Sequence, residues 1–172
     1  MLPWPSRDFS KPAILFLEEI AMSIDILIGL PGSGKTTLAK ELRSKNHGII
    51  VSKDTIRYEM MGIEFGKSLE GEVDRIFNAM LSSVLWGAID NVIIDNTNLT
   101  VPIRARLIEK AQAARRNIIA HVMDIDPYTA WERKKSTGSI MSREDFDVLV
   151  SIYEPVTKRE KFTKAIYHDG QN

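Results

Sequence analysis

The chain has 172 residues, 44% of them hydrophobic and 27% charged, a composition typical of one globular domain. Its 23 basic and 23 acidic residues cancel, so no global positive field favours tight nonspecific binding of nucleic acid. The absence of cysteine excludes disulfides, thiolate zinc sites and a cysteine nucleophile, and it fits a cytoplasmic protein, while no apolar run approaches the ~20 residues of a membrane span.

The first 21 residues differ from the rest of the chain. They contain Trp4, three prolines and the apolar patch 13–17, and the acidic pair Glu18-Glu19 after this patch makes a poor signal peptide. We treat residues 1–21 as an extension that is a short helix, a packing segment or sequence ahead of a start at Met22. Residues 22–172 are then the folded domain.

Residues 29–36, Gly-Leu-Pro-Gly-Ser-Gly-Lys-Thr, match the phosphate-loop (Walker A) pattern G-x-x-x-x-G-K-[ST] at every fixed position. The run 24–28 before them predicts a strand and residues 36–45 after them predict a helix, which is the context that the motif requires. A Gly-rich turn that binds nothing is the alternative. In a phosphate loop, backbone N–H groups and the helix N-terminus bind phosphate, Lys35 reaches the β- and γ-phosphates as a surface-facing charge, and Thr36 holds Mg²⁺. The residues expected to contact a bound nucleotide are Gly29, Pro31, Gly32, Ser33, Gly34, Lys35, Thr36 and Thr37.

Further strands and helices follow in alternation. Apolar runs predict strands at 48–52, 91–95, 117–123 and 165–167, and helical spacing predicts helices at 54–60, 72–88, 102–115, 126–135 and 142–152, with a glycine-containing loop at 62–71. Asp54 and Ser142 are expected to cap their helices. The alternation predicts a three-layer α/β fold, with a parallel sheet of about five strands and helices on both faces. Ligands of such sheets bind beyond the carboxyl ends of the strands.

Two acidic residues follow predicted strands at that edge. Asp54 is a candidate general base for a hydroxyl acceptor, and Arg57, one turn later on the same helix face, is a candidate for orienting a substrate and binding an anion on it. The alternatives are a helix cap at Asp54 and a surface ion pair with Arg57. Asp95 ends an apolar strand, where phosphate-loop proteins place the acid that holds Mg²⁺, although a simple turn would also suit it.

Basic residues gather in two helices. Arg133, with Lys134 and Lys135, precedes a Ser-Thr-Gly-Ser break and suits a lid that closes on ATP, unless the cluster is only solvated. A second set follows Asp95 and is expected to face water rather than nucleic acid: Arg104, Arg106, Lys110, Arg115 and Arg116. The three histidines are scattered without metal-ligand company, and His121 is expected in the core.

From about Ile24 to Asp169 the chain resembles the polynucleotide 5′-hydroxyl kinases of phage and animal repair enzymes, within the phosphate-loop kinases. Four stretches carry the resemblance: 29–37, 51–57 (Val-Ser-Lys-Asp-Thr-Ile-Arg), 92–99 (Val-Ile-Ile-Asp-Asn-Thr-Asn-Leu) and 130–133 (Ala-Trp-Glu-Arg). It implies a kinase domain over 22–172, with Asp54 as general base and Arg57 binding a substrate phosphate. It also implies that the Asp-Asn-Thr-Asn stretch lines the site and that Arg133 engages ATP.

The chain departs from the family in two respects. The second lid arginine of the phage enzymes corresponds to a position near Thr137, which leaves Lys134, Lys135 or Arg143 as substitutes. No segment of these 172 residues resembles the phosphatase domain of many members. Related small kinases with the same motifs phosphorylate other acceptors, including tRNA-linked amino acids, modified DNA bases, nucleotide sugars and antibiotics. The resemblance therefore constrains the phosphate donor more than the acceptor.

The sequence thus predicts a kinase that uses ATP and Mg²⁺ to phosphorylate a hydroxyl group, with the 5′-hydroxyl of a single-stranded DNA or RNA end as leading acceptor. A small-molecule or modified-base kinase is the second hypothesis, and the neutral net charge favours it. A nucleotide-binding switch or ATPase without an acceptor is the third. The pair Asp54 and Arg57 argues against this last hypothesis, because a switch needs no acceptor base.

Overall fold

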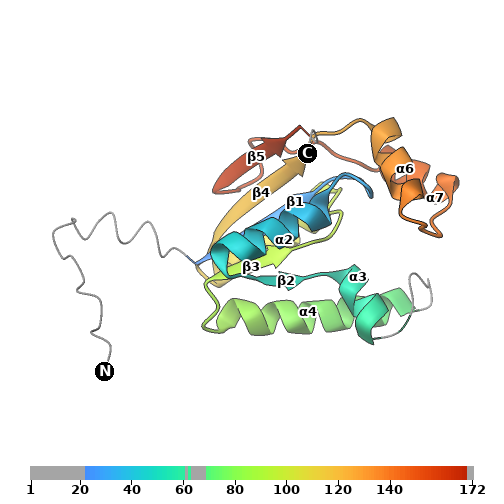
Figure 1. Cartoon of the computed structure of the whole chain (residues 1–172). Coiled ribbons are helices and arrows are strands. Elements are labelled where there is room, and N and C mark those ends of the chain that lie inside the picture. The colour runs from blue at the N-terminus through green and yellow to red at the C-terminus, as the bar shows by residue number, and fades with distance from the viewer. Residues whose placement is uncertain (1–21, 61, 63–68, 170–172) are drawn as a thin grey trace, which may run out of the picture.

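A computed structural model of the chain describes residues 22–60, 62 and 69–169, so the expectations for residues 1–21 lie outside the described residues. The described strands are β1 (Ser23–Ile28), β2 (Ile49–Val51), β3 (Asn91–Ile94), β4 (Asn117–Met123) and β5 (Lys164–His168). They form one sheet in the order β2-β3-β1-β4-β5, and each neighbouring pair is parallel (Figure 1). The predicted parallel sheet of about five strands is confirmed.

Helices cover both faces of this sheet (Figure 1). They are α2 (Lys35–Asn46), α3 (Lys53–Thr55), the π-helical turn η1 (Ile56–Met60), α4 (Glu70–Trp86), α5 (Val101–Ala113), α6 (Pro127–Ser136) and α7 (Arg143–Ser151). Ala39 of α2 packs with Leu27 and Ile93 on one face. Leu81 of α4 and Leu107 of α5 belong to the core cluster on the other face. None of the helices that the structure describes is long and apolar enough to cross a bilayer.

The three inner strands, β1, β3 and β4, are mostly apolar and buried, as expected where helices cover both faces of a sheet. Alternate residues of β1 point to opposite faces, so Ile26 joins the α4 and α5 side while Leu27 joins the α2 side. A separate cluster joins α6 and α7 to the loops after β1 and β3 through Leu30, Leu99, Ala130 and Phe146. This cluster holds the α6–α7 segment at the carboxyl edge of the sheet, beside the phosphate loop.

Helix starts are set by side-chain caps, and one cap differs from the expectation. Ser142 caps α7 as expected, since its hydroxyl accepts a hydrogen bond from the Asp145 N–H at 3.0 Å. The expectation that Asp54 caps its helix is wrong, because the N-cap is Ser52, whose hydroxyl accepts from the Thr55 N–H. Asp54 is the second helical residue, so its carboxylate is not used in the cap. The predicted helix 54–60 is split into α3 and η1.

Two basic residues expected to face water are buried instead. Arg104 is 0% exposed, and it donates to the carboxylate of Glu160 at 2.6 Å and to the carbonyl of Leu99 at 2.9 Å. Arg116 is 5% exposed and donates to main-chain carbonyls, including that of Leu85 at 2.9 Å. Both guanidinium groups satisfy backbone oxygens at loop ends, where a buried unpaired carbonyl would be costly. They are therefore structural residues, unavailable to nucleic acid.

Candidate active site

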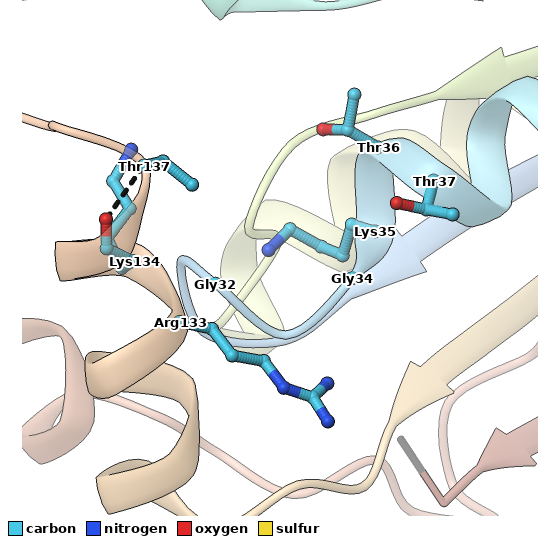
Figure 2. A pocket seen from close by; sticks show the side chains of 8 residues that line it. All are labelled: Gly32, Gly34, Lys35, Thr36, Thr37, Arg133, Lys134 and Thr137. Atoms are coloured by element: carbon cyan, nitrogen blue, oxygen red, sulfur yellow. Dashed lines mark hydrogen bonds between the residues drawn. The ribbon is translucent and has the colours of Figure 1, made fainter. Parts of the chain in front are cut away.

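The phosphate loop joins β1 to α2 and turns at two glycines. Gly32 has φ +81° and Gly34 has φ +94°, in the left-handed region that favours glycine. A Cβ on Gly32 would lie 2.1 Å from the carbonyl oxygen of Ala130 in α6. Only glycine therefore allows α6 to pack directly on the loop, and this contact brings the basic end of α6 over the phosphate site (Figure 2).

The N-terminus of α2 is suited to bind an anion. Its N-cap residue is Gly34, no side chain caps it, and its first turn contains no acidic residue. The first-turn N–H groups and the positive end of the helix dipole are thus available to a ligand. The cavity beside it has a volume of about 460 Å³ and is lined by Gly32, Gly34, Lys35, Thr36, Thr37, Arg133, Lys134 and Thr137 (Figure 2). Gly29 and Pro31 are not among its lining residues, and Ser33 lines a neighbouring cavity instead.

Lys35 is buried, which corrects the expectation of a surface-facing charge. Its Nζ donates to the carbonyl oxygen of Leu30 at 2.7 Å, so the side chain lies within the loop (Figure 2). Burial lowers the pKa of Lys35 from 10.5 to about 8, with a smaller lowering by Lys134, while the charges of Asp95 and Asp54 act in the opposite direction. The site therefore holds a poorly compensated cation that a phosphate would stabilise.

Asp95 and Thr36 lie together between the loop and β3. The Thr36 hydroxyl hydrogen-bonds the Asp95 carboxylate, and burial raises the pKa of Asp95 against the lowering effects of that bond and of Lys35. Among the described residues, no group of three or more His, Cys, Asp or Glu side chains could hold a metal ion. A hydroxyl and one carboxylate nevertheless fit Mg²⁺, which keeps several waters and takes further oxygens from nucleotide phosphates.

The Asn-Thr-Asn stretch after Asp95 connects the loop to the neighbouring segments. The Asn96 side chain accepts from the Lys53 N–H at 2.9 Å, next to Asp54. The carbonyl of Thr97 accepts from the Gly29 N–H at 3.0 Å, and Asn98, buried with φ +48°, donates to the carbonyl of Leu27 at 2.7 Å. These bonds fix the relative positions of the three strand ends that form the site.

Asp54 and Arg57 form an ion pair beside this edge. Arg57 donates from one terminal nitrogen to Oδ1 of Asp54 at 2.5 Å. Its other nitrogens make a bidentate pair with Glu70, with Nε to Oε1 at 2.7 Å. The Asp54 side chain is 90% exposed, whereas that of Arg57 is 11% exposed. Sequence reasoning missed Glu70, because it lies 13 residues from Arg57 across a loop and no spacing rule links them.

The basic residues of α6 and α7 point to different surroundings. Arg133 lines both the phosphate cavity and the neighbouring cavity. Lys134 and Thr137 line the phosphate cavity but not the neighbouring one. Lys135 pairs with Glu132 at 3.0 Å on the exposed side of α6. Arg143 pairs with Asp147 on α7 at 2.8 Å. Of the three candidates to replace a second lid arginine, Lys134 is the one that lines the phosphate cavity.

A phosphate loop at the carboxyl end of the central strand of a parallel sheet, with a Thr–Asp pair and the basic end of a helix beside it, defines a nucleotide-binding phosphate-loop protein of the kinase type. The family model described as an AAA domain matches residues 25–145, and the chain belongs to this family. It is 25% identical over 132 residues to an adenylate kinase of Helicobacter hepaticus, an alignment that covers 70% of each chain.

Solved structures share the same fold. Kti12 of Chaetomium thermophilum, in complex with ADP-AlF3, superposes with a TM-score of 0.68 at 20% identity, covering 84% of this chain and 88% of Kti12. A chain of the Pnkp1/Rnl/Hen1 RNA repair complex superposes with a TM-score of 0.64 at 18% identity, covering 87% of this chain and 52% of that chain. At these identities, the likeness extends to the fold alone.

Proposed function

We propose that the protein is a kinase that transfers the γ-phosphate of ATP to a hydroxyl group, with Mg²⁺ as cofactor and Asp54 as general base. The observation that carries this proposal is the position of Asp54 at the edge of the sheet that holds the phosphate loop. The Asn96 side chain accepts a hydrogen bond from the Lys53 N–H at 2.9 Å, which holds the residue before Asp54 against the segment after Asp95. The charge of Asp54 accordingly acts on the pKa values of both Lys35 and Asp95. A binding site for nucleotide alone would not need an exposed carboxylate there.

In the proposed reaction, the loop N–H groups and Lys35 hold the triphosphate. The oxygen of the acceptor hydroxyl forms a bond to the γ-phosphorus while Asp54 takes the proton of that hydroxyl. The bond between the γ-phosphorus and the β–γ bridging oxygen breaks, and ADP is released. Thr36 and Asp95 would hold Mg²⁺, which neutralises charge on the phosphates. Arg133 and Lys134, from the lid, face the same cavity and would stabilise the charge on the transferring group.

Arg57 would have two roles on the acceptor side. It orients Asp54 through the hydrogen bond between them. We further propose that it binds a phosphate of the acceptor, in which case that phosphate replaces Glu70 as its bidentate partner. The anion of the acceptor would then lie close to its reacting hydroxyl, because one guanidinium group contacts both the anion and Asp54.

A 5′-hydroxyl end of DNA or RNA is our leading acceptor. The resemblance to polynucleotide kinases in the Asp54-to-Arg57 and Asp95-to-Asn98 stretches supports it, because such an acceptor has a phosphate next to its terminal nucleoside. The alternative, a small-molecule or modified-base kinase, is supported by the zero net charge and by the burial of Arg104 and Arg116, which removes two cations from any nucleic-acid surface.

The test uses purified protein, Mg²⁺ and ATP labelled at the γ-phosphate. Label transfer is measured to a panel of hydroxyl-ended single-stranded oligonucleotides and phosphorylated small metabolites. Transfer to oligonucleotides, with an acceptor KM that rises with salt, would support the leading acceptor. Transfer to metabolites alone would support the alternative. ATP hydrolysis or binding without transfer to any hydroxyl would favour a switch or ATPase and overturn the kinase proposal.

A further inference from the structure

The side chain of Asn96 connects the end of β3 to the start of α3. Asn96 is half-buried and lies two residues after Ile94, the last residue of β3. Its Oδ1 atom accepts a hydrogen bond of 2.9 Å from the N–H of Lys53, the first residue of α3. Asp54 follows Lys53 in the chain, and Asp95 precedes Asn96. One hydrogen bond therefore joins the neighbours of the proposed base and of the proposed metal-binding residue.

The helix that carries Asp54 depends on contacts from outside it. With three residues before the π-helical turn, α3 is too short to be stable by itself. The N–H groups of a first helical turn have no partner within the helix. In α3, the Ser52 hydroxyl accepts from the Thr55 N–H, and the Asn96 side chain accepts from the Lys53 N–H. Asn96 thus satisfies one of these groups and also fixes the start of α3 against the segment after β3.

The position of Asn96 is itself fixed by its neighbours in the chain. The Asp95 N–H donates to the carbonyl of Val51 in β2 at 3.1 Å. The Asn98 side chain donates to the carbonyl of Asn96 at 3.3 Å and to that of Leu27 in β1 at 2.7 Å. Because β1 leads directly into the phosphate loop, the Asn96 side chain belongs to the same framework as that loop.

Ion pairs tie the other side of α3 to α4. Lys53 pairs with Asp74, and Arg57 in η1 makes its bidentate pair with Glu70. The start of α4 lies beside α3 (Figure 1). These contacts hold the acceptor side of the site together, whereas the bond from Asn96 attaches this side to the framework of the phosphate loop.

We infer that Asn96 is a positioning residue, which sets the place of the Asp54 carboxylate relative to a γ-phosphate on the loop. It acts through the backbone of Lys53 and needs no contact with either substrate. This inference rests on the proposed function, because it assumes that Asp54 takes the acceptor proton. A displacement of about 1 Å in a catalytic group can lower a rate by about 10²-fold. Nucleotide affinity depends on the loop itself and would not change.

Three variants of the full chain test the inference. Asn96→Leu has a similar size but no hydrogen-bond acceptor, whereas Asn96→Asp keeps an oxygen acceptor for the Lys53 N–H. Asn91→Leu is the matched control at the opposite end of β3, where the Asn91 side chain accepts from the Ser23 hydroxyl at 2.9 Å and donates to the Asn46 carbonyl at 2.7 Å. Thermal unfolding should show that Asn91→Leu, which loses two hydrogen bonds, is destabilised at least as much as Asn96→Leu.

Transfer from labelled ATP is measured to a 5′-hydroxyl oligonucleotide, or to a phosphorylated metabolite if the panel shows transfer to metabolites alone. With both substrates saturating, Asn96→Leu should transfer about 10- to 100-fold more slowly than the wild type. Its ADP affinity by calorimetry and its acceptor KM should stay within about threefold of the wild-type values. Asn96→Asp should regain most of the lost rate, and Asn91→Leu should transfer at the wild-type rate.

Several results would overturn the inference while leaving the kinase activity intact. These are a wild-type rate in Asn96→Leu, an equal loss of rate in Asn91→Leu, an ADP affinity that falls as much as the rate, or an Asn96→Asp variant as slow as Asn96→Leu. If Asn96→Leu does not fold, Asn96→Ala, whose side chain has no hydrogen-bond acceptor, replaces it with the same expectations. A wild type that transfers label to no acceptor would instead overturn the proposed function, and the inference with it.

Discussion

Arg57 is almost buried and Asp54 is almost fully exposed, yet one hydrogen bond of 2.5 Å joins them. Two further hydrogen bonds, to the carboxylate of Glu70, fix the orientation of the Arg57 guanidinium independently of Asp54. An exposed carboxylate would otherwise sample several rotamers. The pair thus places a solvent-accessible base in one orientation at the edge of the sheet.

We predict that Asp54→Asn removes phosphoryl transfer but keeps nucleotide affinity. The amide cannot take the acceptor proton, and loss of a general base typically costs ~10²–10⁴-fold in turnover. Single-turnover transfer and ADP calorimetry measure the two properties separately. Asp90→Asn is the matched control, since Asp90 is also exposed but precedes β3 at the opposite edge of the sheet. Weakened nucleotide binding with turnover spared would make Asp54 a metal or structural residue.

The bond between Arg57 and Glu70 predicts a selective effect on the acceptor. Arg57→Ala removes charge-assisted hydrogen bonds worth about 1.5–3 kcal/mol, so the acceptor KM should rise roughly tenfold or more while the ATP KM changes little. Glu70→Gln should lower the acceptor KM and leave the ATP KM unchanged, because the acceptor phosphate then replaces a weaker partner of Arg57. Glu72→Gln serves as its control, because Glu72 pairs with Arg75 on the exposed side of the same helix. An equal rise in both KM values would remove Arg57 from the acceptor side.

The burial of Lys35 predicts how the free energy of unfolding depends on pH. Its pKa is about 8 in the folded chain and 10.5 in the unfolded chain, so below pH 8 the buried charge costs up to about 3 kcal/mol of folding free energy. The unfolded chain binds more protons between pH 8 and 10.5, and stability therefore gains a positive contribution from Lys35 as pH rises through this window. Lys35→Met should abolish transfer, stabilise the nucleotide-free protein at pH 7 and lose this pH-dependent gain.

Urea unfolding at pH 7 and pH 10, on wild type and variant, measures this effect. Lys45→Met, in the exposed last turn of α2, is the control and should show neither change. A variant less stable than the wild type at pH 7 would indicate that the hydrogen bond from Lys35 to Leu30 outweighs the cost of burying the charge.

The fold was largely predictable because its signals are local. Residues 117–123 were predicted as a strand from their apolar run, and β4 is observed over Asn117–Met123. The phosphate loop was predictable because phosphate binding by backbone N–H groups requires glycine and lysine at fixed spacing. The predicted core position of His121 is confirmed, but its bond to Asp25 spans 96 residues and has no sequence signature.

The errors at Arg104, Arg116 and Lys35 share one cause, which is burial that depends on packing and not on local spacing. Arg104 and Arg116 have the charge of surface residues, and only the packed loops supply the carbonyl oxygens that bury them. Lys35 has the pattern of a ligand-binding lysine, and its burial was not predictable because it depends on how the loop folds back to bring the carbonyl of Leu30 to Nζ. Such contacts follow from tertiary structure and not from spacing along the chain.

The last prediction concerns residues 1–21, which lie outside the described residues. A chain that begins at Met22 should fold and retain full activity, because β1 begins at Ser23 and every residue of the candidate site follows it. The apolar patch Ala13-Ile14-Leu15-Phe16-Leu17 provides the contrary expectation. Burial of each large side chain would contribute ~1.5–3 kcal/mol, and several together would matter to a domain of marginal stability. Thermal unfolding of the full and shortened chains distinguishes the two. A melting temperature lower by more than about 10 °C in the shortened chain would correspond to a few kcal/mol and would make the extension an integral part of the fold.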